Sequence, residues 1–137
     1  MREGATKPAA NPARRPVILI VEDEILIRSA TAANLRQQSF RVLEASNGAE
    51  AIEVLAADTP VDLVFTDVVL SHPVDGLELL RWIVERRLKI PVILTSGQRS
   101  FAAAAKNITQ DAKFVPKPYR INELANYFRA LLIDSFA

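Results

Sequence analysis

The sequence contains no cysteine, and its 137 residues include a single histidine, a single tryptophan and a single methionine. Without cysteine there is no disulfide framework, no thiolate zinc site and no cysteine nucleophile, a usage compatible with a reducing cytoplasm. The one histidine, His72, lies in the loop-like segment SHPVDG, and we expect a solvated loop residue rather than a phosphohistidine. The chemistry of this chain must therefore come from other residue types.

Long apolar runs and a charge excess of one sign are also missing. No apolar run approaches the roughly 18 residues of a membrane-spanning helix, and the N-terminus lacks the apolar core of a signal peptide. Lysine and arginine number 17 and aspartate and glutamate 16, so the net charge of +1 gives no reason to expect a nucleic acid or a membrane as the main partner. We expect a cytoplasmic protein.

The chain divides into an N-terminal arm, residues 1–15, and one domain, residues 16–137. The arm combines prolines and alanines with four dispersed cations, which predicts a flexible, mildly basic and solvated tail. The whole chain is 50% hydrophobic, which is enough for a core, and it is too short for a second domain of ordinary size.

Short valine- and isoleucine-rich runs alternate with segments of helical period in this domain. The predicted strands are Val17–Val21, Arg41–Ala45, Val61–Thr66, Val92–Thr95 and Lys113–Val115. The predicted helices are Ile25–Gln38, Ala49–Ala57, Gly76–Arg87, Ser100–Ile108 and Ile121–Leu132. Five strands alternating with five helices predict a parallel α/β sheet covered on both faces.

Two details of the helices follow from spacing and from cap preferences. In the first helix Leu26, Ala30 and Ala33 recur at helical spacing, which predicts one stripe of that helix. Asn47 and Asn122 precede helical runs and are candidate N-caps.

Polar side chains gather where the predicted strands end. They are Glu22, Asp23 and Glu24 after the first strand, Asp67 after the third, Thr95 and Ser96 at the fourth, and Lys117 after the fifth. Ligands of such sheets bind outside the carboxyl ends of the strands, where the strand order reverses. Carboxylates packed so closely repel one another, and a hard divalent cation such as Mg²⁺ offsets that repulsion.

Each of these residues also has a purely structural interpretation. Asp23 is a possible N-cap of the helix that starts at Ile25. Lys117 lies between two prolines and could be a solvated turn residue, and Ser96 could be a loop residue. Their joint placement at the ends of four strands favours a site.

The motifs VEDE, TDVVL, LTSG and KPY, in this order, resemble the receiver domain of two-component response regulators. The resemblance covers about Arg15 to Leu132. It implies a flavodoxin-like, doubly wound five-stranded parallel sheet of strand order 2-1-3-4-5. It also implies a non-enzymatic phosphoprotein whose phosphoryl group comes from a histidine kinase or a histidine phosphotransfer protein.

The resemblance assigns roles to the residues of these motifs. Asp67 matches the phosphoacceptor and Asp23 the direct Mg²⁺ ligand. Glu22 matches an acidic neighbour that acts largely through water, and Val69 the residue whose backbone carbonyl completes the protein ligands. Lys117 matches the lysine that pairs with the phosphoryl oxygens.

The resemblance further implies a switch. Ser96 matches the hydroxyl that turns toward the phosphoryl group, with Thr95 as the alternative, and Phe114 matches the aromatic that moves with it, although plain core packing would also explain Phe114. Two features depart from the family pattern: Ser71 stands where a proline is common, and the segment SFAAAAKNITQDA is short or irregular for the fourth helix.

Partners are implied only in kind. Five residues follow Leu132, so we expect a stand-alone receiver, monomeric or dimerising on phosphorylation, that acts as messenger or relay for an unknown downstream target. The family docks its kinase around positions that here are Ile25, Leu26, Arg28, Ser29 and Pro118, although the apolar ones could instead be core.

Two rival functions remain. A phosphorylation-independent binding module would have no physical need to keep four mutually repelling or desolvated charges together. A magnesium-dependent phosphohydrolase would usually carry a second acid two residues after its nucleophile, and Val69 fills that position.

Overall fold

A single twisted parallel sheet organises the molecule in the computed structural model, which describes residues 14–136. Its strand order is β2-β1-β3-β4-β5, as predicted. The strands are β1 (Val17–Val21), β2 (Arg41–Ala45), β3 (Leu63–Asp67), β4 (Val92–Ser96) and β5 (Lys113–Pro116). The predicted N-terminal arm lies almost entirely outside the described residues.

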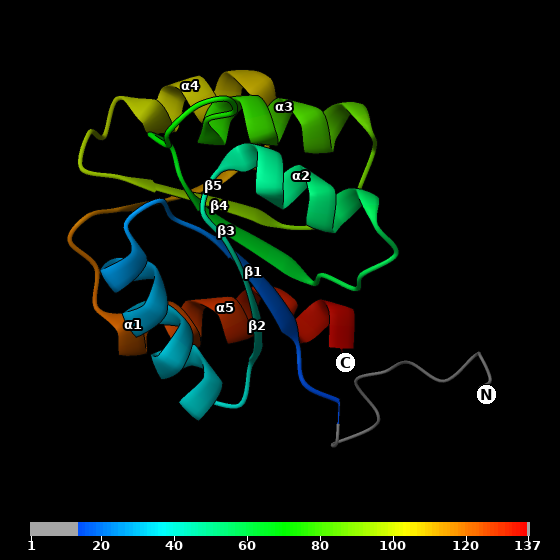
Figure 1. The fold of residues 1–137 in the computed structure, drawn as a ribbon, viewed down its shortest axis with the longest axis vertical. Helices are drawn as coiled ribbons and strands as arrows, with labels where there is room; N and C mark the ends of the chain where they lie inside the picture. Colours follow the sequence, from blue (N-terminus) through cyan, green and yellow to red (C-terminus); the bar gives the residue numbers. More distant parts are fainter. Residues whose placement is uncertain (1–13, 137) are drawn as a thin grey trace.

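Five helices cover the two faces of this sheet (Figure 1). They are α1 (Ile25–Gln37), α2 (Gly48–Ala56), α3 (Gly76–Glu85), α4 (Phe101–Ile108) and α5 (Ile121–Phe136). Helices α1 and α5 lie on one face, and α2, α3 and α4 lie on the other. None of the helices in the described part of the chain has both the length and the apolar character needed to cross a membrane.

Alternation along the strands divides the core into two layers. Ile18, Ile20, Leu63 and Phe65 belong to the layer under α1 and α5, whereas the alternating residues Leu19, Val21 and Val64 belong to the layer under α2, α3 and α4. Because side chains alternate with a period of two, Asp67 continues the series of Leu63 and Phe65. The alternation within the core therefore fixes the face of the sheet on which each residue at a strand end lies.

The boundaries of β3 differ from the prediction. The strand begins at Leu63 rather than at Val61, because Asp62 serves β1 instead: its Oδ2 accepts a hydrogen bond from the backbone N–H of Val17 at 2.8 Å. The strand also includes Asp67 as its last residue. The carboxylate of Asp67 is therefore held by the sheet itself rather than by a loop.

The predicted caps have mixed outcomes. Asn47 is the N-cap of α2 and accepts from the backbone N–H of Glu50 at 2.9 Å, as expected. The prediction for Asn122 is wrong, since this residue lies inside α5 and its Oδ1 accepts from Gln38 at 3.0 Å. Asp23 is not the N-cap of α1 either, because Glu24 occupies that position.

The stripe predicted for α1 is its solvent face. Leu26 is 82% exposed and Ala30 and Ala33 are exposed too, whereas the buried residues of this helix are Thr31, Ala32 and Leu35. The amphipathic pattern of α1 is weak because apolar residues occur on both of its sides. Local spacing alone could not decide which stripe the core would take.

Candidate functional site

Three carboxylates meet at the carboxyl end of the sheet. Glu22 and Asp23 follow β1 and Asp67 ends β3, and because these strands are neighbours, one oxygen of each carboxylate lies within 4.8 Å of the other two. Glu22 and Asp67 are 5% and 6% exposed, while Asp23 faces solvent. Carboxylate oxygens at this spacing, with one side open, suit a hard cation such as Mg²⁺.

Lys117 supplies the positive charge of this cluster. Its Nζ lies 2.8 Å from Asp67 Oδ1 and 3.7 Å from Glu22 Oε1, and its backbone N–H donates to the carbonyl of Ser96 at 3.0 Å. Burial alone would lower the pKa of this ammonium, but the hydrogen bond to Asp67 and the two negative charges raise it overall. The lysine is therefore a charged member of the site and not a solvated turn residue.

Glu22 titrates unusually because it is buried beside another acid. Burial, helped by a hydrogen bond to Asp67, raises its pKa from 4.5 to about 8, against the opposing effect of the Glu24 N–H that donates to its Oε2 at 3.1 Å. Part of the cluster can thus hold a proton at neutral pH when no cation is bound. Charge compensation is what this cluster requires.

This shift gives the metal-free protein a pH-dependent stability. An acid whose pKa is higher in the folded than in the unfolded chain binds its proton more tightly when folded, so its contribution is full below pH 4.5 and is lost as the pH rises through about 8. We expect the free energy of unfolding, measured in urea with a chelator present, to fall across this interval by on the order of 1 kcal/mol or more. In Glu22→Gln this decrease in the free energy of unfolding with rising pH should vanish. An unchanged pH profile would contradict the assignment of the decrease to Glu22.

The two hydroxyls at the end of β4 face opposite layers. Thr95 pairs with Asp67 in the strand register and shares its face by alternation, whereas Ser96 follows Leu94 on the other face. Ser96 Oγ accepts from the backbone N–H of Gln98 at 3.0 Å. Thr95 is 2% exposed, and its Oγ1 has no hydrogen-bond partner among the described residues.

An unpartnered buried hydroxyl lowers stability, so its removal should raise it. We expect Thr95→Val to increase the free energy of unfolding by about 1 kcal/mol, because valine keeps the shape and removes the desolvated polar group. Thr66→Val is the matched control: Thr66 is equally buried but its Oγ1 donates to the Asp67 carbonyl at 2.9 Å, so stability should fall by about 1 kcal/mol. Urea denaturation of both variants tests this; a loss in Thr95→Val would show a hydrogen bond that the structure lacks.

Phe114 and Val69 keep their sequence-based assignments as predictions. Phe114 is half-buried on β5, pairs with Leu94 and packs in the layer under α3 and α4, on the same face as Ser96. That position is compatible both with a switch and with core packing. Val69 lies two residues after Asp67 with its side chain 64% exposed.

Three neighbours of the site were not predicted. The Arg28 guanidinium donates to the Glu22 carbonyl at 2.8 Å, the Gly76 N–H donates to the Val68 carbonyl at 2.8 Å, and Tyr119 packs edge-on against Phe65 at 5.5 Å. Burial raises the pKa of the Tyr119 hydroxyl, which also hydrogen-bonds with Thr31. Tyr119 had a sequence signal because it completes the KPY motif, whereas Arg28 was expected only at the docking surface.

An apolar patch borders the site at the start of α1. Ile25 and Leu26 are 63% and 82% exposed, so the alternative that these residues belong to the core is wrong. Ser29 and Pro118 are exposed as well. The interpretation of this patch as a docking surface stays a prediction.

A doubly wound parallel sheet that carries three carboxylates and a lysine at its carboxyl edge defines a class of protein with a charged site where ligands of this fold bind. Residues 18–129 match the response regulator receiver domain, and the chain belongs to this family. The predicted family and strand order are thereby confirmed.

Similar proteins agree with this assignment. The chain is 33% identical over 134 residues to the sensor kinase CckA of Brucella abortus, and the aligned region covers 96% of this chain and 14% of the kinase. It is 35% identical over 109 residues to a putative NtrX-like response regulator of Rickettsia felis, covering 78% of this chain and 23% of that protein. The chain thus spans only a minor part of these relatives.

Solved structures show the same fold. A response regulator receiver protein from Sinorhizobium medicae superimposes with a TM-score of 0.79 at 28% identity, covering 89% of this chain and 98% of that one. The receiver domain of the hybrid histidine kinase CckA gives a TM-score of 0.69 at 33% identity, covering 85% and 98%.

Proposed function

We propose that this chain accepts a phosphoryl group on Asp67, in a magnesium-dependent reaction, from the phosphohistidine of a histidine kinase or phosphotransfer protein. The observation that carries the proposal is the 2.8 Å contact between Lys117 Nζ and Asp67 Oδ1 inside a cluster of three carboxylates. A core built only for stability would have no use for these charges.

The chemistry is a transfer between two nucleophiles. A carboxylate oxygen of Asp67 forms a bond to phosphorus while the bond from phosphorus to the histidine nitrogen breaks, and the electron pair leaves with the imidazole. The product is an acyl phosphate. Lys117, held beside Asp67 by its backbone bond to Ser96, neutralises charge on the phosphoryl oxygens.

The metal ligands in this proposal are Asp23, Asp67 and the carbonyl of Val69, with Glu22 acting through water. Bound there, Mg²⁺ would offset the repulsion among the carboxylates and the incoming phosphoryl oxygens. The raised pKa of Glu22 supports this fit, because it results from burial of this carboxyl group beside a second carboxylate, Asp67.

The signal in this proposal is the added charge, about −1.5 to −2 at neutral pH. Ser96 would exchange its hydrogen bond with the Gln98 N–H for one to the phosphoryl group, and Phe114 on the same face of the sheet would follow. The exposed patch of Ile25 and Leu26, with Arg28, Ser29 and Pro118 beside it, would receive the phosphohistidine-bearing partner.

Intact-mass measurement after incubation with acetyl phosphate tests the proposal. We expect the mass of one phosphoryl group to be added in the presence of Mg²⁺ and not with a chelator in its place. No addition, together with absent Mg²⁺ binding, would contradict the proposal and favour a receiver-like module that binds its partner without phosphorylation.

A further inference from the structure

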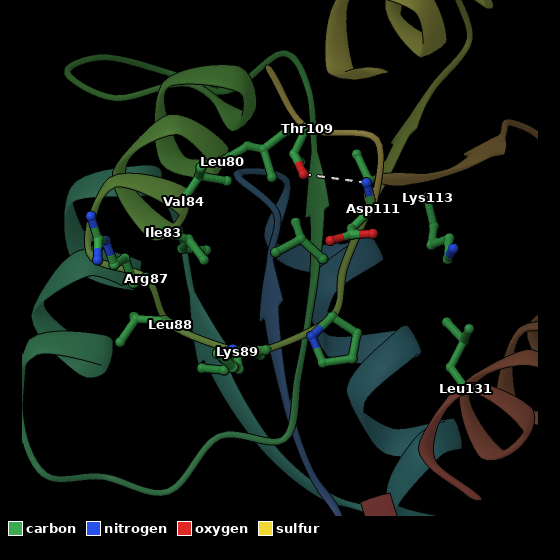
Figure 2. A pocket seen from close by; sticks show the side chains of 14 residues that line it. Leu80, Ile83, Val84, Arg87, Leu88, Lys89, Thr109, Asp111, Lys113 and Leu131 are labelled. Atoms are coloured by element: carbon green, nitrogen blue, oxygen red, sulfur yellow. Dashed lines mark hydrogen bonds between the residues drawn. The ribbon is translucent and has the colours of Figure 1, made fainter. Parts of the chain in front are cut away.

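Two hollows with volumes of about 580 and 410 Å³ lie away from Asp67, and their charges differ. The larger, about 580 Å³, is enclosed by α3, the start of β4, the turn before β5 and α5 (Figure 2). Its cations, Arg87, Lys89 and Lys113, share the lining with the carboxylate of Asp111, whose backbone N–H donates to Thr109 Oγ1 at 3.2 Å. Mixed charge of this kind does not select a ligand of one sign.

The smaller hollow, about 410 Å³, is lined by cations without any acid. Arg15, Arg36 and Arg41 lie around an apolar floor that includes Val17, Phe40 and Val42. We call it the arginine hollow. Because Val17 and Arg41 begin β1 and β2 while Asp67 ends β3, and the strands are parallel, this hollow lies at the opposite edge of the sheet from the phosphoacceptor.

Two of the acids that lie close to lining residues in the sequence, Asp62 and Glu44, are already engaged. Asp62 accepts from Arg14 at 3.0 Å and from the Val17 N–H at 2.8 Å. Glu44 accepts from Arg28 and from Arg36, both at 3.3 Å. Asp58 precedes Thr59 of the lining but does not line the hollow itself.

Two of the three guanidinium groups consequently lack a counter-charge. Neither Arg15 nor Arg41 forms an ion pair or a side-chain hydrogen bond with any residue that the structure describes, and both are exposed. Guanidinium groups bind phosphate and carboxylate oxygens through paired N–H donors. An anion that reaches both Arg15 and Arg41 would neutralise positive charge that no described acidic residue neutralises.

The floor, the Arg36 side chain and the Arg41 backbone are held in place before any ligand arrives. Phe40 is 3% exposed, and the Arg129 guanidinium lies 5.3 Å from its ring centroid. The Arg36 guanidinium donates to the Val42 carbonyl at 2.9 Å, and the Arg41 N–H donates to the Pro16 carbonyl at 2.9 Å. A preformed site loses less conformational entropy on binding than a mobile one.

We infer that the arginine hollow binds a small organic anion, with a phosphate or carboxylate group held by Arg15 and Arg41 and an apolar body against the floor. Its volume falls in the range of roughly 300–1,000 Å³ that is typical of small-molecule sites. The inference goes beyond phosphoryl acceptance and does not depend on it, because none of the groups involved belongs to the Asp67 cluster.

Amide chemical-shift titration of the ¹⁵N-labelled chain tests this inference. The probes are phenyl phosphate, phenylacetate, inorganic phosphate and the uncharged 2-phenylethanol. We expect the aromatic anions to shift the amides of Phe40, Arg41 and Leu43, and 2-phenylethanol to bind about tenfold more weakly. Comparison of the two aromatic anions distinguishes phosphate from carboxylate recognition, and inorganic phosphate shows what the apolar body adds.

Matched variants separate a specific site from general charge. Arg15→Gln with Arg41→Gln should weaken binding of the aromatic anions about tenfold, whereas Arg81→Gln with Arg86→Gln, which removes the same charge from α3 and its C-cap, should leave it unchanged. Arg36 stays intact because it binds the Val42 carbonyl. Equal binding of 2-phenylethanol, shifts confined to other surfaces, or equal weakening in both double variants would overturn the inference.

Discussion

Asp67→Asn is expected to abolish the gain of a phosphoryl group from acetyl phosphate completely, as judged by intact mass. An amide oxygen carries no negative charge, so it is a poor nucleophile, a poor ligand for Mg²⁺ and a poor partner for Lys117 Nζ, which lies 2.8 Å from Asp67 Oδ1. The substitution changes almost no volume in a side chain that is 6% exposed, so packing should be preserved.

The control for this variant is Asp58→Asn. Asp58 is an exposed acid in the loop between α2 and β3, so its substitution removes the same charge at a distance from the site. This variant should be phosphorylated as the unaltered chain is. A phosphoryl group found on the Asp67→Asn protein, mapped by peptide mass to another carboxylate, would overturn the assignment of the acceptor.

Gly76→Ala is expected to lower the free energy of unfolding by about 3 kcal/mol or more. A Cβ at this position would lie 2.1 Å from the Asp67 carbonyl oxygen and 2.8 Å from Val68 Cα. Both are backbone atoms at the end of the central strand, so neither can rotate away, and the hydrogen bond from Gly76 N–H to the Val68 carbonyl would be strained as well.

Gly97→Ala is the matched control in urea denaturation. Gly97 directly follows β4, which also ends at the site. A Cβ on Gly97 would meet no atom within 4 Å, so the free energy of unfolding should change by less than about 0.5 kcal/mol. We also expect Gly76→Ala to slow phosphorylation, because the backbone that must move is that of Asp67. Equal stability of the two variants would show that the loop after β3 yields easily.

Much of the architecture could be predicted from residue periodicity alone. Runs such as Val17–Val21 are apolar throughout because a parallel strand is buried on both faces, and the helical segments between them are long enough for crossover connections. The same reasoning located Glu22, Asp67 and Lys117 at strand ends, where the parallel arrangement brings them to one edge. The start of β3 was placed at Val61 rather than at Leu63, since the bond between Asp62 and Val17 is a long-range contact.

By itself, then, the sequence determined the alternation of strands and helices and the residue types at the strand ends, because both are written in local patterns. The tertiary structure alone decided which stripe of α1 faces water, that Thr95 rather than Ser96 shares the face of Asp67, and that Gly76 touches the Asp67 carbonyl. It also brought Arg15 and Arg41 together around one hollow. Each of these depends on groups distant in the chain, whose approach no local periodicity encodes.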